Sequence, residues 1–278
     1  FLWDRFNTQP DPALAGILVT LAGRARPEDL KGERLKTLLA LAPATAADQV
    51  GLGQLLARVQ ETNAAAVQFQ RALAATNTAT QRDAIKGLGS LGRASEATPV
   101  LADWVQRRPQ FFVEDLTLGI TAARTRDPAV IQGLEAAWKA AATEDGQQLA
   151  YALLLDYGRG QTQDLAPRLA TLASAPGVSI PQLETLATVC AETGHPEVRL
   201  KLLQRLAGPG HPRSTRHRAL TEWAKASAAT GDLAGAFEAL ARLEDGWIQE
   251  YGAEAREAVA EAITAGNVAS IQDALVKA

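Results

Sequence analysis

Apolar residues recur along the chain in short clusters whose spacing is typical of helices. One position of the pattern returns every 32 to 37 residues. It is occupied by Leu38, Ala72, Trp104, Trp138, Leu172, Leu206, Leu243 and Ala278. Three residues before these anchors, seven of the eight residues are large and apolar, so each pair falls on one helical face. The pattern predicts an amphipathic helix that recurs at a nearly fixed period.

A second recurrent position lies twelve residues before each anchor. It is occupied by Arg26, Gln60, Gly92, Arg126, Gly160, Gly194, Gly231 and Gly266. Glycine adopts positive φ angles without a steric penalty, and it commonly ends a helix. We therefore predict two helices joined by a tight turn in every unit, and no strands. Because one pair cannot bury its apolar face alone, consecutive pairs are expected to stack.

This period divides the 278 residues into eight helix-turn-helix units. Their expected bounds are 12–45, 46–77, 78–111, 112–145, 146–179, 180–216, 217–251 and 252–278. Residues 1–11 are expected to be the remnant of a preceding repeat. Neither end shows the polar cap of a terminal repeat, so the array is expected to continue in both directions. The stretch 207–217 contains two prolines and two glycines and predicts a bend.

Individual residues also fit a known repeat. The second unit has Leu52-Gly53 in its first helix and Ala65, Phe69 and Ala72 in its second. In these residues and in its period, the chain resembles the tetratricopeptide repeat (TPR). The resemblance covers essentially the whole chain, with departures at Arg199, which stands at a normally small site, and at the two tryptophan anchors. It implies an all-α fold, a TPR-like α-α superhelix (solenoid) of about eight repeats.

Composition and charge exclude several classes of function. The chain has 28 Lys and Arg residues against 31 Asp and Glu residues, so its net charge of −3 gives no overall attraction to nucleic acid. No apolar run approaches the roughly 18 residues of a membrane span, and no membrane insertion is expected. The single cysteine, Cys190, excludes an internal disulfide and is expected in the core. A single cysteine does not indicate the cellular compartment of the protein.

Motifs that could carry chemistry have a structural explanation. Residues 87–92, Gly-Leu-Gly-Ser-Leu-Gly, match the dinucleotide-binding fingerprint, but they lie along a predicted helix instead of joining a strand to a helix. We expect Gly87 and Gly89 to allow close helix packing. The three histidines lie in or near connections without the spacing of a helical zinc site. The sequence therefore predicts no catalytic, cofactor-binding or metal-binding residues, and no enzyme.

In proteins that resemble this chain, the first helix of each repeat lines a concave groove. Alignment of the first helices places eight cations toward it, namely Arg24, Arg58, Arg82, Lys86, Arg124, Arg218, Lys225 and Arg256. Only Glu184 and Glu192 are expected beside them as acids. Such a surface attracts anions, and arginine binds carboxylates through two parallel hydrogen bonds. The alternative is that these cations are solvated and paired across neighbouring repeats.

The groove predicts a scaffold that docks a partner protein or an extended peptide, with acidic segments favoured. The expected partner-binding residues are Arg58, Arg82, Lys86, Arg124, Tyr157, Arg218 and Lys225. Trp247 and Tyr251 form a candidate exposed aromatic contact. A second interpretation is a periplasmic segment of a bacterial exopolysaccharide export protein, in which an anionic polysaccharide occupies the groove. It rests on resemblance to divergent, alanine-rich repeats in such proteins, and it favours the periplasm.

Overall fold

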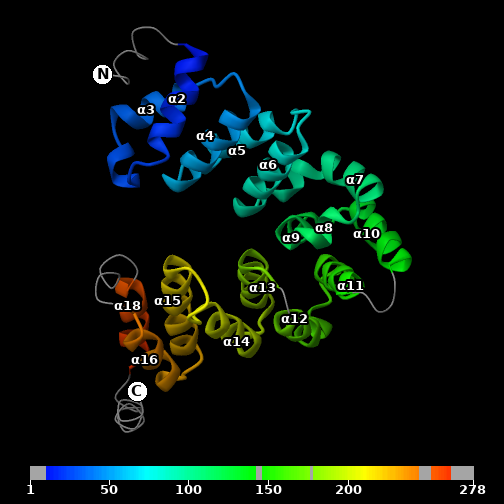
Figure 1. The fold of residues 1–278 in the computed structure, drawn as a ribbon, viewed down its shortest axis with the longest axis vertical. Helices are drawn as coiled ribbons and strands as arrows, with labels where there is room; N and C mark the ends of the chain where they lie inside the picture. The colour runs from blue at the N-terminus through cyan, green and yellow to red at the C-terminus, as the bar shows by residue number, and fades with distance from the viewer. Residues whose placement is uncertain (1–10, 142–145, 176–177, 244–251, 264–278) are drawn as a thin grey trace. The chain divides into compact units, whose positions relative to one another are not determined.

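The computed structural model describes residues 11–141, 146–175, 178–243 and 252–263. These residues form sixteen α-helices and three short 3-10 helices, and they contain no strand (Figure 1). The predicted all-α class is therefore confirmed. The backbone divides into two compact units, Phe1–Gly160 and Gln161–Ala278, which are described separately. The expected remnant 1–11 lies almost entirely outside the described residues, as do Gly266, Ala278, Trp247 and Tyr251.

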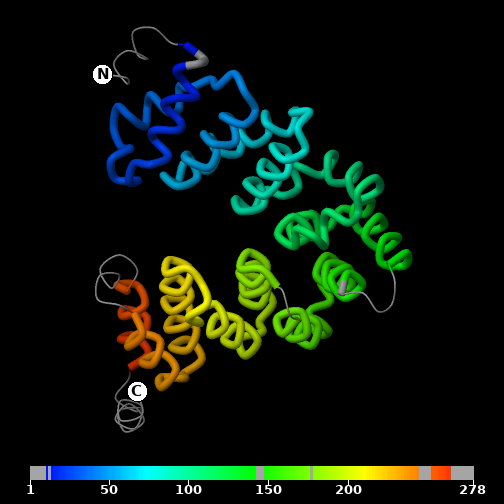
Figure 2. The backbone as a smooth tube through the Cα atoms, viewed as in Figure 1, coloured from blue at the N-terminus to red at the C-terminus, as the bar shows by residue number. Residues whose placement is uncertain are grey.

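The first unit alternates helices and short connections (Figure 2). Its helices are α2 (Pro12–Ala22), η1 (Pro27–Leu30), α3 (Glu33–Ala40), α4 (Ala46–Arg58), α5 (Thr62–Ala72), α6 (Thr78–Ser90), η2 (Ala94–Ala97), α7 (Thr98–Arg107), α8 (Phe111–Glu114), α9 (Leu116–Arg124), α10 (Pro128–Ala140) and α11 (Gly146–Arg159). Helix α4 packs against α5. In addition, α2 packs against α4, α4 against α6, α6 against α9, and α9 against α11. We call these five, together with α13, α15 and α18, the first helices.

The second unit continues the alternation. Its helices are η3 (Thr162–Asp164), α12 (Leu165–Ser174), α13 (Ile180–Thr193), α14 (Pro196–Leu206), α15 (Arg213–Ala229), α16 (Leu233–Ala241) and α18 (Gly252–Ala262). Helix α13 packs against α14, and α15 packs against both α16 and α18. The first helices α13 and α15 make few backbone contacts with each other.

Six of the residues at the predicted turn position have a left-handed backbone conformation. Its φ angle is 72° at Gly92 and Gly160, 75° at Gly194 and 77° at Gly231. Glycine accepts this conformation without strain, so these helices end abruptly as predicted. At the first expected turn, Arg26 has a φ of −74° instead, and a 3-10 helix follows it.

The same turn forms where the sequence has no glycine. Gln60 and Arg126 have φ angles of 66° and 52°. The N–H of Glu61, which follows Gln60, donates to the carbonyl of Leu56 at 2.9 Å. The corresponding bond after Gly92, from Arg93 to Leu88, is also 2.9 Å long. The same turn geometry thus forms at two residues that adopt it at a cost.

Phe69 of α5 fixes the spacing between two first helices. Its side chain is 1% exposed. A Cβ atom added at Gly53 of α4 would lie 2.7 Å from its ring, and one added at Gly87 of α6 would lie 2.4 Å from it. Gly89 is similarly close to Thr121 of α9, at 2.5 Å. The expectation that Gly87 and Gly89 allow close packing is confirmed, and both lie within a helix.

Most of the predicted anchors lie in the core. Leu38, Ala72, Trp104, Leu206 and Leu243 are buried. Trp138 and Leu172 are only partly buried, so the core prediction holds less well in α10 and α12. Cys190 is buried as expected. Burial raises the pKa of its thiol to about 12, although the charge of Arg199 opposes this rise.

Candidate functional site

Two neighbouring cavities lie along the first helices of the first unit. One, of about 320 Å³, is lined by α2 and α4, and the other, of about 450 Å³, is lined mainly by α4 and α6. Both include the exposed residues Gln54 and Arg58. We call the two cavities together the α2–α4–α6 groove. It lies on the helices that the sequence predicted to carry the binding surface.

Arg58 is engaged within the fold. Its guanidinium donates to the backbone carbonyls of Gly23 and Ala25, both at 2.9 Å. These carbonyls follow the C-terminal end of α2, where backbone acceptors lack helical partners. This expected partner-binding residue therefore also joins α4 to the end of α2.

Arg82 and Lys86 of α6 converge on one carboxylate. The same oxygen of Asp115 accepts a hydrogen bond from Arg82 at 2.9 Å and from Lys86 at 2.7 Å. The other oxygen accepts from the backbone N–H of Leu118 at 3.2 Å and so caps α9. Burial alone would raise the pKa of Asp115, but the hydrogen bonds and charges of Lys86 and Arg82 outweigh burial and lower it.

A third cation joins this group through an aromatic ring. The guanidinium carbons of Arg82 and Arg108 lie 5.3 and 5.6 Å from the ring centre of Phe111. Arg108 also donates to the hydroxyl of Thr78 at 3.0 Å. We call Arg82, Lys86, Arg108, Phe111 and Asp115 the Asp115 cluster. It holds three cations, and among the residues the structure describes Asp115 is the one acid that pairs with Arg82 and Lys86.

Arg124 and Tyr157 form another pair. Nε of Arg124 on α9 donates to the hydroxyl of Tyr157 on α11 at 3.0 Å. The side chains of both residues are partly buried. The structure thus brings together two residues that were predicted to bind a partner, and these two residues bond to each other.

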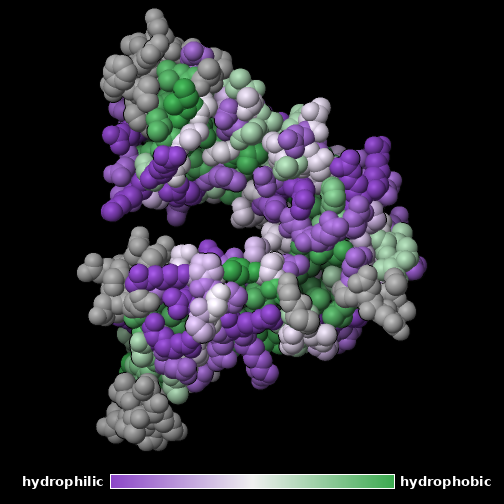
Figure 3. Space-filling view, viewed as in Figure 1, coloured by the Kyte–Doolittle hydropathy of each residue, from purple (hydrophilic) through white to green (hydrophobic). Residues whose placement is uncertain are grey.

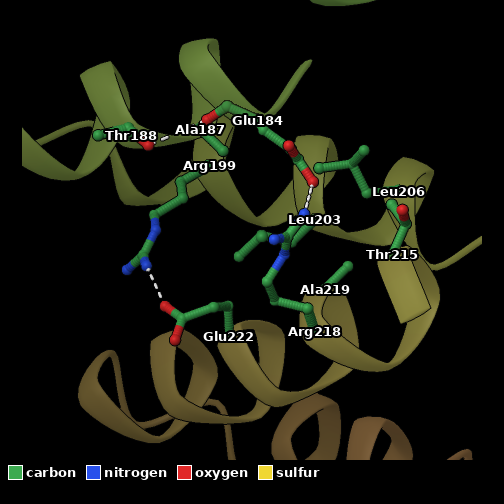
Figure 4. Close-up of a pocket in the computed structure, with 10 residues that line it drawn as sticks. All are labelled: Glu184, Ala187, Thr188, Arg199, Leu203, Leu206, Thr215, Arg218, Ala219 and Glu222. Carbon is green, nitrogen blue, oxygen red and sulfur yellow. Dashed lines mark hydrogen bonds and ion pairs between the residues drawn. The ribbon is translucent and has the colours of Figure 1, made fainter. Parts of the chain in front are cut away.

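The second unit has a cavity of about 330 Å³ among α13, α14 and α15 (Figure 4). Arg218 of α15 pairs with Glu184 of α13 at its edge. Arg199 of α14 pairs with Glu222 of α15 at 2.8 Å. Lys225 of α15 bonds to Glu222 at 3.1 Å and to Glu254 of α18 at 3.2 Å. We call this space the α13–α15 cavity.

These contacts reduce the excess of positive charge that the sequence predicted beside the groove. Asp115, Glu222 and Glu254 pair with cations for which the sequence pattern predicted no acidic partner. Asp115 was missed because it lies between α8 and α9, outside the aligned helices. Glu222 had a visible signal, since it stands four residues after Arg218 and three before Lys225 on one helical face. Arg24 and Arg256 are exposed.

The face drawn in Figure 3 carries many hydrophilic residues, with an apolar patch over α2. Ile17 and Leu21 on that helix are 52% and 44% exposed. No described helix is both long and apolar enough to cross a membrane. Within the same residues, no three His, Cys, Asp or Glu side chains gather as a potential metal site.

Comparison with known proteins adds no relative. No family model, no curated protein and no solved structure matches the chain.

Proposed function

We propose that the chain is a TPR-like solenoid of about eight units that docks an extended, acidic peptide segment along its first helices. Contacts between residues one period apart support the repeat. Arg58 bonds to Gly23, and Arg242 to Ala207, each across 35 residues. Arg82 bonds to Asp115, and Arg124 to Tyr157, each across 33 residues. Arg218 bonds to Glu184 across 34 residues. Polar contacts thus repeat with the same period as the apolar anchors.

The observation that carries the proposed partner is the Asp115 cluster beside the α2–α4–α6 groove. Lys86 belongs to both, because it bonds to Asp115 and lines the 450 Å³ cavity. Arg82 and Lys86 share one carboxylate, and Arg108 lies against Phe111 beside them, so the cluster keeps an excess of positive charge even though Asp115 partly neutralises it. Arginine retains donors after one bond, since its guanidinium carries five N–H groups. A carboxylate of a peptide in the groove is the complementary ligand.

A binding role also agrees with the chemistry of the one cysteine. The thiol of Cys190 is buried, and burial raises its pKa to about 12. A nucleophilic cysteine needs an accessible thiolate. Cys190 is therefore a core residue, and it takes no part in the proposed function.

The proposal is tested with a labelled decapeptide of alternating glutamate and glycine, capped at both ends, by fluorescence anisotropy at low salt. Lys86→Gln should weaken binding about fivefold or more, because it removes one charge of the cluster while Arg82 still holds Asp115. Lys139→Gln is the matched control, since Lys139 is an exposed cation on α10 that pairs with Glu135 and lines neither cavity of the groove. Added salt should weaken the wild-type complex.

Two results would contradict this function. One is no binding of the decapeptide by the wild-type chain at low salt, and the other is equal loss in Lys86→Gln and Lys139→Gln. Alginate in the same assay tests the second interpretation of the sequence. Competition by alginate at lower concentrations than by unlabelled decapeptide would favour the export machinery over peptide docking.

A further inference from the structure

The α13–α15 cavity opens where the packing of first helices is interrupted. In the first unit, α4 packs against α6 and α6 against α9, and in the second unit α15 packs against α18. Helices α13 and α15 make few backbone contacts instead. The interval between the anchors Leu206 and Leu243 is the longest in the chain, at 37 residues. It includes Pro209 and Pro212, which cannot continue a helix. The break seen in the sequence thus coincides with an opening between first helices.

One part of the wall of this cavity is apolar. Ala187 of α13, Leu203 and Leu206 of α14, and Ala219 of α15 line it, and each is at most 6% exposed. Thr215 also lines the cavity and gives its wall a hydroxyl group. At about 330 Å³, the space is near the lower end of the range for ligand sites, roughly 300 to 1,000 Å³. It suits one aliphatic side chain with the backbone beside it.

Two arginines stand at the edge of this wall, each held by a glutamate (Figure 4). Arg199 bonds to Glu222 through one terminal nitrogen, and Arg218 bonds to Glu184 in the same way. The remaining N–H groups of each guanidinium are available to a ligand. Because the glutamates already orient the arginines, binding a second carboxylate costs little additional side-chain entropy.

Arg199 is the less neutralised of the two arginines. Glu222, its partner, also accepts a hydrogen bond from Lys225, so one carboxylate serves two cations. The side chain of Arg199 is only 25% exposed, whereas that of Arg218 is 61% exposed. A partly dehydrated arginine binds a carboxylate more strongly than an exposed one does.

We propose that the α13–α15 cavity binds a leucine-sized aliphatic side chain of an extended peptide, and that Arg199 binds the side-chain carboxylate of an adjacent acidic residue. This inference rests on the proposed function, because it specifies a second feature of the same class of partner. The Thr215 hydroxyl is placed to bond to the peptide backbone beside the aliphatic residue. The cavity therefore selects acidic segments that contain a leucine-sized residue.

The test uses the full chain and the capped peptide acetyl-Gly-Ser-Glu-Leu-Glu-Ser-Gly-amide, with affinities measured by isothermal titration calorimetry. Replacement of the peptide's leucine by glycine, or of its glutamates by glutamine, should each weaken binding about tenfold. Arg199→Gln should have a similar effect, and Lys225 still pairs with Glu222 in this variant. Ala219→Leu should also abolish most binding, because it fills the cavity and leaves every charge in place. Circular dichroism and melting curves establish that the variants are folded.

Lys201→Gln is the matched control, since Lys201 is an exposed cation on the same helix as Arg199 and does not line the cavity. Wild-type affinity in folded Ala219→Leu, or equal losses in Arg199→Gln and Lys201→Gln, would overturn the assignment. So would tighter binding of an uncapped peptide that ends in leucine, which would identify a terminal carboxylate as the ligand. If the cavity variants have no effect while Lys86→Gln still weakens the glutamate-glycine decapeptide, this inference fails and the proposed function stands. If the cavity variants weaken binding while Lys86→Gln has no effect, the α13–α15 cavity remains a binding site and the α2–α4–α6 groove is not one.

Discussion

Phe69 of α5 and Gly87 of α6 are in such close contact that a methyl group at position 87 would lie 2.4 Å from the aromatic ring. Gly87→Ala should therefore destabilise the chain by about 1 to 3 kcal/mol, because the ring or the helix must move. An alanine in a helix otherwise stabilises it relative to glycine, so the sign of the change is diagnostic. Chemical denaturation measures the effect. Gly210→Ala is the control, as no atom lies within 4 Å of the added group, and its stability should stay close to wild type.

The two turns without glycine can be improved. Gln60→Gly and Arg126→Gly should each stabilise the chain by up to about 1 kcal/mol, because glycine adopts the left-handed conformation without the penalty of a side chain. Gly92→Ala should have the opposite effect, of about 1 kcal/mol. Differential scanning calorimetry of the three variants provides the measurement. A lower melting temperature for both glycine variants would show that their side chains contribute more than the strain costs.

Asp115 makes stability depend on pH in the acidic range. Its pKa is lowered below 3.8 in the folded chain, so the stabilisation is present above the unfolded value and is lost as the pH falls through the folded one. Asp115→Asn should cost about 1 to 3 kcal/mol at pH 7, while asparagine still caps α9. The difference from wild type should shrink below pH 3.8.

Urea denaturation between pH 7 and pH 3 follows this difference. Asp103→Asn is the control, because Asp103 pairs with Arg107 at an exposed position and should contribute little at any pH. A constant difference between Asp115→Asn and wild type across the range would show that the charge of Asp115 is not what stabilises the fold.

Leu169 and Leu203 occupy the same position of the repeat but should differ in their contribution to stability. Leu169 is fully buried, so Leu169→Ala should cost about 3 to 5 kcal/mol. Leu203 lines the α13–α15 cavity, and Leu203→Ala should cost about 2 kcal/mol because part of its side chain already faces open space. Equal losses in urea denaturation would indicate that the cavity is closed in solution.

The helical pattern could be predicted because it depends on local rules. The turn position was found from glycine at Gly92, Gly160, Gly194 and Gly231, and the period then placed Gln60 and Arg126 at equivalent turns. The period did not reveal the exception at Arg26, where a 3-10 helix follows. One departure from the repeat consensus could be seen in the sequence, but its structural role could not. Arg199 was recognised as an unusual residue, but only the position of α15 shows that it borders a cavity.

The charge of the binding surface could be predicted only in part. The cations Arg82 and Lys86 were identified together because residues four apart share a helical face. Their partner Asp115 comes from the connection that precedes α9, and its position depends on how one helix pair packs on the next. Ion pairs between units are a property of tertiary structure, so counting charges within helices overestimated the positive surface.

The one-period separation of the polar contacts also constrains how such a chain can change in length during evolution. Arg58, Arg82 and Arg124 each reach a residue 33 to 35 positions away, so each contact joins adjacent units. An insertion or deletion of about 34 residues removes or duplicates one set of partners and leaves the others in register. A change of half that length would place a turn against a helix and break every contact across the junction. Duplication or loss of about 34 residues is therefore the change in length that best preserves these contacts.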